Sequence, residues 1–158
     1  LITTSCGGCN HPDLSVDQIY GKQISRGKQL SHRELKIALD EMRDGMKLFE
    51  ATGGCHGAAL LDSTGDVHFV SEDIGRHNAV DKTVGLAILS GINGFNEFTL
   101  LLSGRCGWDI VAKASRIGIS NIASVGAFSS AAMELARENG ICLYGFVRES
   151  GAWKVGIN

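Results

Sequence analysis

The chain has 158 residues, of which 44% are hydrophobic and 20% are charged, and its formal net charge is −2. This length predicts one domain with a sizeable core, and the composition excludes fibrous, collagen-like and disordered proteins. The near-neutral charge argues against a nucleic-acid-binding protein, and the aliphatic runs fall far short of the roughly 18 residues of a membrane span. Because no secretory signal is visible either, we expect a cytoplasmic protein with no nucleic-acid partner and no membrane partner.

Residues 1–30 are polar, contain glycine and show little periodicity, so we expect a mobile loop segment that carries Cys6 and Cys9. In a reducing compartment, a Cys-x-x-Cys pair is typical of redox, sulfur-carrying or metal-binding proteins. Zinc needs about four ligands and only His11 could add one nearby, so we expect no tightly bound metal. A cysteine pair on a glycine-rich loop can instead accept a sulfane sulfur and release it to another thiolate or acceptor. A zinc-binding or redox module without transferase activity remains the alternative.

Residues 31–158 are expected to form a single α/β domain. The first helix is predicted to begin at Ser31, which forms a capping box with Glu34, and to continue at helical spacing as far as Gly53–Gly54. Turn residues at 62–66 separate two short apolar runs, which predicts a β-hairpin. Helices and strands then alternate, with helices near 76–90, 107–117 and 130–139, and strands near 98–103, 121–126, 141–147 and 152–156. This order predicts parallel pairing in a three-layer α/β sandwich with a mixed sheet.

Three strand-to-helix junctions, at residues 72–78, 103–105 and 126–130, each enter a helix through small or hydrogen-bonding residues. Ligands of open α/β sheets gather at the carboxyl ends of parallel strands, where helix N-termini present free N–H groups. Glycine lets a phosphate approach the backbone, and Arg76 and Arg105 can bind phosphate oxygens. Ordinary turn and cap chemistry would explain any one junction. Their repetition favours a polyanionic, nucleotide-like ligand, although neither the P-loop nor the dinucleotide-binding fingerprint occurs.

Two histidines lie in or near these junctions. His77 follows Arg76 at a predicted helix start, where it could bind a ligand or serve as a buried cap. His56 follows the double glycine Gly53–Gly54, and it is either a structural residue or a ligand contact.

Adjacent carboxylates and scattered cysteines have simpler interpretations. Glu72 and Asp73 should fall on opposite faces of a strand, which argues against a paired acid/base role. Cys106 lies at a predicted helix N-terminus, where the helix dipole would lower the pKa of a thiol, although we favour an ordinary small residue there. Cys55 and Cys142 lie beside apolar strand residues and are interpreted as small hydrophobic residues.

Several motifs together have a family likeness. In order, they are Thr3–Cys9, Thr52–His56, Glu72–Lys82, Ser103–Arg105 and Gly145–Arg148. They closely resemble the FdhD/NarQ family over nearly the whole chain, and residues 72–82 are the most distinctive part. The resemblance implies a cytidine deaminase-like fold, and that the N-terminal part of the family is absent here. A zinc-dependent deaminase itself is not expected, because the Pro-Cys-x-x-Cys string of such enzymes does not occur.

The resemblance also implies a function and a set of site residues. It implies a sulfurtransferase that receives persulfide sulfur from a cysteine desulfurase on Cys6 and Cys9. The sulfur would pass to the molybdenum or tungsten of a bis-guanine-dinucleotide molybdopterin cofactor, bound as a ligand, for formate dehydrogenase. A homodimer is also implied. With the junctions above, the expected cofactor-binding residues are Gly53, Gly54, His56, Gly75, Arg76, His77, Asn78, Lys82, Ser103, Gly104 and Arg105.

Overall fold

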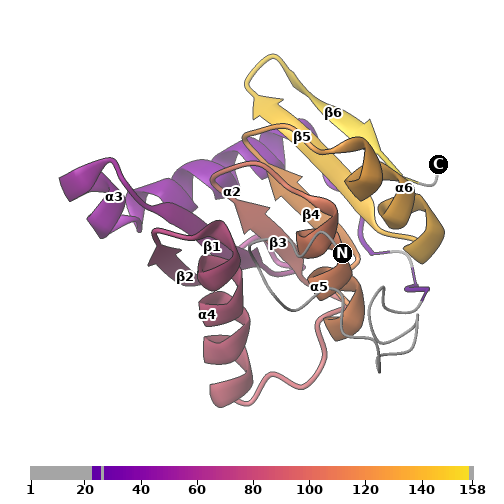
Figure 1. Ribbon diagram of the computed structural model, residues 1–158, viewed down its shortest axis with the longest axis horizontal. Helices are drawn as coiled ribbons and strands as arrows, with labels where there is room; N and C mark the ends of the chain where they lie inside the picture. The colour runs from indigo at the N-terminus through magenta and orange to yellow at the C-terminus, as the bar shows by residue number, and fades with distance from the viewer. Residues whose placement is uncertain (1–22, 26, 157–158) are drawn as a thin grey trace, which may run out of the picture.

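The computed structural model describes residues 23–25 and 27–156, which form a six-stranded mixed sheet between two layers of helices (Figure 1). One face is covered by α2 (His32–Asp44) and α3 (Lys47–Thr52), and the other by α4 (Arg76–Leu89), α5 (Trp108–Ile117) and α6 (Ser130–Asn139). The strands are β1 (His56–Leu61), β2 (Val67–Asp73), β3 (Thr99–Leu102), β4 (Asn121–Ser124), β5 (Cys142–Arg148) and β6 (Gly151–Val155). The predicted α/β sandwich with a mixed sheet is confirmed. Its cytidine deaminase-like character and the division at residue 30 stay predictions, and Cys6 and Cys9 lie outside the described residues.

The sheet has the order β2-β1-β3-β4-β5-β6. Strands β3, β4 and β5 pair in parallel, whereas β1 is antiparallel to both β2 and β3, and β6 is antiparallel to β5. Because β1 is antiparallel to both of its neighbours, β2 runs in the same direction as β3. The carboxyl ends of β2, β3, β4 and β5 therefore share one edge of the sheet, and β1 begins there.

The central strands are buried on both faces, which explains their continuous apolar sequences. Along β1, Ala58 and Leu60 belong to the core under α4, α5 and α6, whereas Ala59 and Leu61 belong to the core under α2. This period of two is the strand geometry expected from the sequence. The two cores hold the helical layers in place on either side of the shared edge.

The first predicted helix is two helices in the structure. The capping box at Ser31 is present, with Glu34 N–H donating to Ser31 Oγ and the Ser31 N–H donating to Glu34 Oε2 at 2.8 Å. The helix ends at Asp44, and Met46 has non-helical dihedral angles (φ −85°, ψ 77°) before α3 begins. Met46 is 2% exposed and packs over Gly57 of β1, so core packing outweighs the helical spacing that the sequence continues to show.

Candidate functional site

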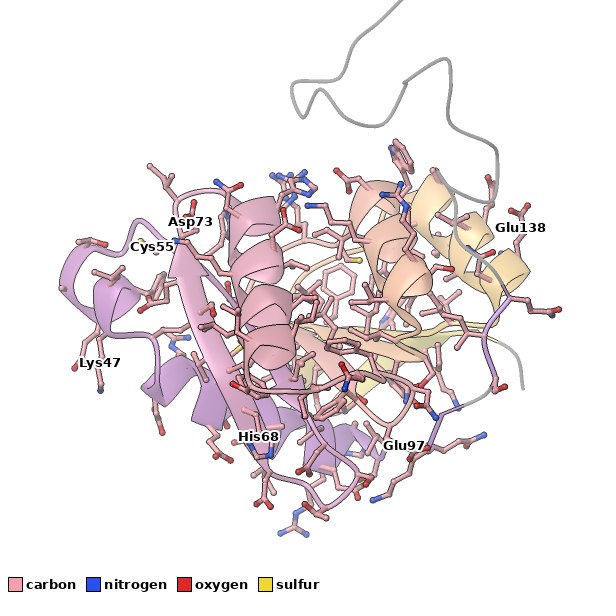
Figure 2. The ribbon with its side chains drawn as sticks, turned by 90° about the horizontal axis from the view of Figure 1, so that it is seen from below. Lys47, Cys55, His68, Asp73, Glu97 and Glu138 are labelled. Atoms are coloured by element: carbon pink, nitrogen blue, oxygen red, sulfur yellow. The ribbon has the colours of Figure 1, made fainter. Side chains whose placement is uncertain are left out.

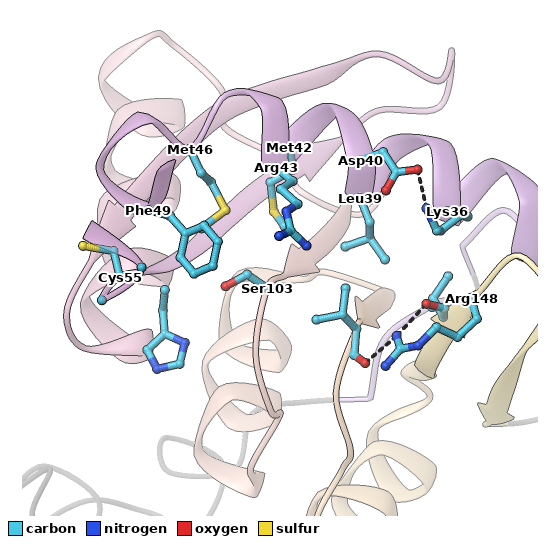
Figure 3. A pocket seen from close by; sticks show the side chains of 15 residues that line it. Lys36, Leu39, Asp40, Met42, Arg43, Met46, Phe49, Cys55, Ser103 and Arg148 are labelled. Carbon is cyan, nitrogen blue, oxygen red and sulfur yellow. Dashed lines mark hydrogen bonds and ion pairs between the residues drawn. The ribbon is translucent and has the colours of Figure 1, made fainter. Parts of the chain in front are cut away.

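A cavity of about 550 Å³ opens at the carboxyl edge of the sheet, on the face covered by α2 and α3 (Figure 3). This volume is within the range of about 300–1,000 Å³ that is usual for small-molecule sites. Its lining comes from α2 and α3, from the segment between α3 and β1, and from the ends of β3, β4 and β5. The lining residues are Lys36, Leu39, Asp40, Met42, Arg43, Met46, Phe49, Gly53, Gly54, Cys55, His56, Ser103, Val125, Val147 and Arg148.

The cavity combines an apolar wall with positive charge. Its wall includes the buried side chains of Leu39, Met42 and Met46 and the ring of Phe49. The Arg43 guanidinium carbon lies 5.5 Å from the centroid of the Phe49 ring, which is a cation–π distance. Arg148 is held in place because its Nη1 donates to the carbonyl oxygens of Val125 and Val147, both at 2.9 Å. Such a lining suits a ligand with a planar ring and an anionic part.

Four of the predicted cofactor-binding residues line this cavity: Gly53, Gly54, His56 and Ser103. Ser103 joins the end of β3 to the start of β1, because its Oγ accepts from Gly57 N–H at 2.7 Å and its N–H donates to Gly57 O at 3.0 Å. A Cβ atom on Gly104 would lie 2.9 Å from His56 Nδ1. Glycine at position 104 therefore makes the space in which the half-buried imidazole of His56 lies beside the cavity.

Five other predicted residues, Gly75, Arg76, His77, Asn78 and Lys82, lie at the start of α4 on the opposite face of the sheet. Asp73 accepts from Gly75 N–H at 2.9 Å and from Asn78 Nδ2 at 3.1 Å, and its carboxylate lies 2.6 Å from Lys82 Nζ. The hydrogen bond from Lys82, followed by those from Gly75 and Asn78, lowers the pKa of Asp73 to about 2. Asn78 and Lys82 thus help to hold the α4 N-terminus, and they do not line the cavity.

His77 and Arg76, at this second place, differ in their partners. His77 Nε2 lies 2.9 Å from Asp109 Oδ2 near the start of α5, and the two side chains are only 15% and 16% exposed. Burial lowers the pKa of His77, against the opposing effect of the Asp109 charge. Among the described residues, the buried Nε of Arg76 has no hydrogen-bond partner, whereas His77 Nε2 is paired with Asp109. Arg105, the last predicted residue, is exposed.

The adjacent carboxylates of Glu72 and Asp73 bind different helices, as the alternation of side chains along a strand predicts. Glu72 accepts from Leu48 N–H at 2.9 Å and from Phe49 N–H at 2.7 Å, so it caps the N-terminus of α3, whereas Asp73 caps α4. In Figure 2, Asp73 and Cys55 lie at one end of the molecule, and His68 and Glu97 lie at the other. The carboxyl edge is therefore a distinct end of the fold.

The cysteines of the described part have different environments. Cys106 is 1% exposed, and burial raises the pKa of its thiol to about 12. The pKa lowering expected from a helix dipole is thus wrong, because the cost of burying a thiolate outweighs it. The interpretation of Cys106 as a small packed residue fits this burial. Burial also raises the pKa of Cys142, and Cys55 is half-buried at the cavity.

Three ligand-type side chains, Asp62, Asp66 and His68, lie close together at the β1–β2 turn, and no other such group occurs among the described residues. Asp62 already accepts from the N–H groups of Thr64, Gly65 and Asp66, so it organises the turn. The string His32–Glu34 has the His-x-Glu spacing of zinc deaminases, but Glu34 is used in the capping box of α2. Within the described ranges, no helix is long and apolar enough to span a membrane.

Sequence reasoning missed several residues of the cavity. Lys36, Asp40 and Arg43 belong to the polar pattern of an ordinary amphipathic helix, which carries no signal of a site. Arg148 could have been found, since it stands at the carboxyl end of a predicted strand, as the other junction residues do.

The sequence is similar to one family model and to curated relatives that share one name. The model of the FdhD/NarQ family matches residues 1–153. The "Sulfur carrier protein FdhD" of Picrophilus torridus is 41% identical over 150 residues, covering 94% of this chain and 57% of the relative. That of Streptomyces coelicolor is 44% identical over 151 residues, with 94% of this chain and 54% of the relative covered. The chain thus spans about half the length of the curated relatives it matches.

A solved structure is also similar. The crystal structure of a protein from Desulfotalea psychrophila, assigned as a formate dehydrogenase accessory protein, matches with a TM-score of 0.75 and 30% sequence identity. The match covers 85% of this chain and 58% of that one.

Proposed function

The chain belongs to the FdhD/NarQ family, and on this premise we propose that it is a sulfur carrier that serves formate dehydrogenase. A cysteine desulfurase loads a persulfide on Cys6 or Cys9, and the sulfur passes to the molybdenum or tungsten of a bis-guanine-dinucleotide molybdopterin cofactor, which is the substrate of the transfer. The names of the relatives and of the similar solved structure support the sulfur-carrying and accessory parts of this proposal. The protein acts as a sulfurtransferase, and two copies form a homodimer.

The cavity at the carboxyl edge is the observation on which the proposal depends. A guanine nucleotide, which is one end of the cofactor, needs an apolar wall for its base and positive charge for its phosphates. Leu39 and Met42 supply the wall, and Arg43 and Arg148 supply the charge. The residues present therefore fit the nucleotide end of this substrate.

The α4 N-terminus offers a second contact on the opposite face of the same edge. Among the described residues, the buried Nε of Arg76 has no hydrogen-bond partner, His77 beside it is paired with Asp109, and a helix N-terminus favours anions. We assign them to another anionic part of the same large substrate.

Sulfur loading is tested by incubating the reduced protein with a cysteine desulfurase and cysteine, and measuring the intact mass. The parent should gain sulfur, and the Cys6→Ala, Cys9→Ala double variant should not. Cys55→Ala is the matched control, because it removes a half-buried thiol beside the cavity and should leave loading unchanged. Equal loading of the double variant and the parent would refute Cys6 and Cys9 as carriers.

Nucleotide binding is tested by calorimetry with GDP. Arg43→Ala and Arg148→Ala should each weaken binding about ten- to a hundredfold, the scale of a charge-assisted hydrogen bond. Lys47→Ala is the control, because Lys47 is an exposed cation of α3 that does not line the cavity. If Arg76→Ala weakens GDP binding and the two cavity variants do not, the nucleotide binds at the α4 N-terminus instead.

A further inference from the structure

Lys36 and Asp40 form a donor–acceptor pair on the wall of the cavity. They stand one turn apart on α2, their side chains form an ion pair, and both line the cavity. Their side chains are 26% and 57% exposed, so a ligand in the cavity can reach them. Figure 3 shows this pair at the end of the cavity near Arg148, with Cys55 and Phe49 at the other end and Arg43 between them.

Asp40 is the one acidic residue among the fifteen that line the cavity. A carboxylate in a cavity that Lys36, Arg43 and Arg148 also line opposes the binding of a polyanion through space. As an ion pair on a helix surface, Lys36–Asp40 would contribute little to stability. The position of Asp40 has a functional explanation if its carboxylate accepts hydrogen bonds from donor groups of the ligand.

Guanine has the edge that such a pair recognises. Its O6 is an acceptor, and its N1–H and 2-amino groups are adjacent donors, whereas adenine presents a donor at N6 and an acceptor at N1. A lysine ammonium only donates and an ionised carboxylate only accepts. In one orientation of the base, the pair is therefore matched to guanine and mismatched to adenine at both positions.

We propose that Lys36 and Asp40 select guanine over adenine in this cavity, with Lys36 Nζ donating to O6 and the Asp40 carboxylate accepting from N1–H and the 2-amino group. The proposal rests on the proposed function, which brings a guanine nucleotide to the cavity. The base lies against Leu39 beside this pair, and the phosphates lie between Arg43 and Arg148.

The test compares the affinities of GDP, ADP and xanthosine diphosphate by calorimetry. The parent should bind GDP about ten- to a hundredfold more tightly than ADP. Asp40→Asn places an amide donor where the carboxylate accepted, and xanthine carries a carbonyl where guanine carries its 2-amino group. The variant should therefore lose GDP affinity and gain affinity for xanthosine diphosphate. Ratios between nucleotides are the readout, because the removed charge affects the phosphates of all three equally.

Glu50→Gln is the matched control, since it breaks the exposed Lys47–Glu50 ion pair of α3 outside the cavity and should leave every ratio unchanged. Equal binding of GDP and ADP by the parent, or an unchanged GDP preference in Asp40→Asn, overturns the assignment and leaves nucleotide binding by the cavity intact. If none of the three nucleotides binds, the proposed cofactor site itself fails.

Discussion

The thiols of this chain differ more in their burial than in their sequence context. Cys106 follows Arg105 at a strand-to-helix junction, yet it belongs to the core under α4, α5 and α6 and is 1% exposed. Cys55 stands at the cavity and is half-buried. A sulfur carrier benefits from this difference, because an inert buried thiol does not compete for persulfide with the carrier cysteines.

The first prediction is that Cys106 resists alkylation in the folded protein. With its pKa raised to about 12 by burial, the thiol is almost entirely protonated at pH 8, and the thiolate is the reactive form. Treatment with iodoacetamide followed by peptide mass spectrometry should label Cys55 much faster than Cys106. In urea the two rates should become similar. Rapid native labelling of Cys106 would mean that the junction opens readily.

Glycine at position 104 controls the place of His56, which gives a second prediction. Gly104→Ala introduces a Cβ atom 2.9 Å from His56 Nδ1, so the imidazole must move and GDP affinity should fall. Gly94→Ala is the control, because Gly94 does not line the cavity and the added Cβ would have its nearest neighbour at an ordinary 3.7 Å. Thermal unfolding measured alongside separates a moved side chain from a damaged fold. Unchanged GDP binding in Gly104→Ala would remove His56 from the site.

The candidate site could be predicted only in part, for a physical reason. Ser103 was predicted because the rule on carboxyl ends of strands needs only strand order and local sequence, and His56 was predicted because it follows the double glycine Gly53–Gly54. Asp40 and Arg43 were missed because they reach the cavity only through the packing of α2 across the sheet. No local pattern distinguishes them from other charged residues on a helix surface.

The start of a helix could be predicted from local sequence signals, whereas the break between α2 and α3 depends on tertiary contacts. Ser31 caps α2 as predicted, because a capping box is contained within four residues. The break between α2 and α3 was not visible, because Met42, Met46 and Phe49 keep helical spacing across it. It depends instead on Met46 packing over β1 and on Glu72 of β2 capping α3. Both contacts join segments that are distant in the sequence.

The third prediction concerns the cap of α4. The pKa of Asp73 is lowered to about 2 in the folded protein, against about 3.9 in an unfolded chain. The unfolded state therefore binds more protons between these values, so the stabilisation by ionised Asp73 is present above about pH 4 and is lost as pH falls toward 2. Asp73→Asn should be less stable than the parent at neutral pH, and the difference should shrink across this window.

Denaturant unfolding at a series of pH values checks this prediction. Asp44→Asn, a change at the exposed end of α2, serves as the control and should follow the parent at every pH. A stability difference for Asp73→Asn that stays constant from pH 7 to pH 2 would show that the cap does not depend on the charge.

In the whole molecule, one edge of the sheet brings together candidate site residues from segments that are far apart in the chain. Because β1 is antiparallel to both β2 and β3, the end of β2 lies at the same edge as the ends of β3, β4 and β5. The sheet itself then divides the predicted residues between the cavity under α2 and the N-terminus of α4. This division could not be predicted, because sequence order places residues at an edge without giving the face. A large substrate with several anionic parts could contact both faces of such an edge.

The last prediction is that sulfur loading and nucleotide binding are separable. The cavity residues that the structure describes lie between positions 36 and 148. Cys6→Ala and Cys9→Ala variants should therefore bind GDP like the parent. Arg43→Ala and Arg148→Ala should accept persulfide from the desulfurase yet fail to activate formate dehydrogenase, because the sulfur would have no positioned cofactor to receive it. Mass measurements, calorimetry and a formate oxidation assay on the same variants test these complementary defects. If Cys6→Ala also abolished GDP binding, the cysteine segment would have to form part of the pocket at rest, and a fixed thiol beside the cofactor would replace a swinging carrier.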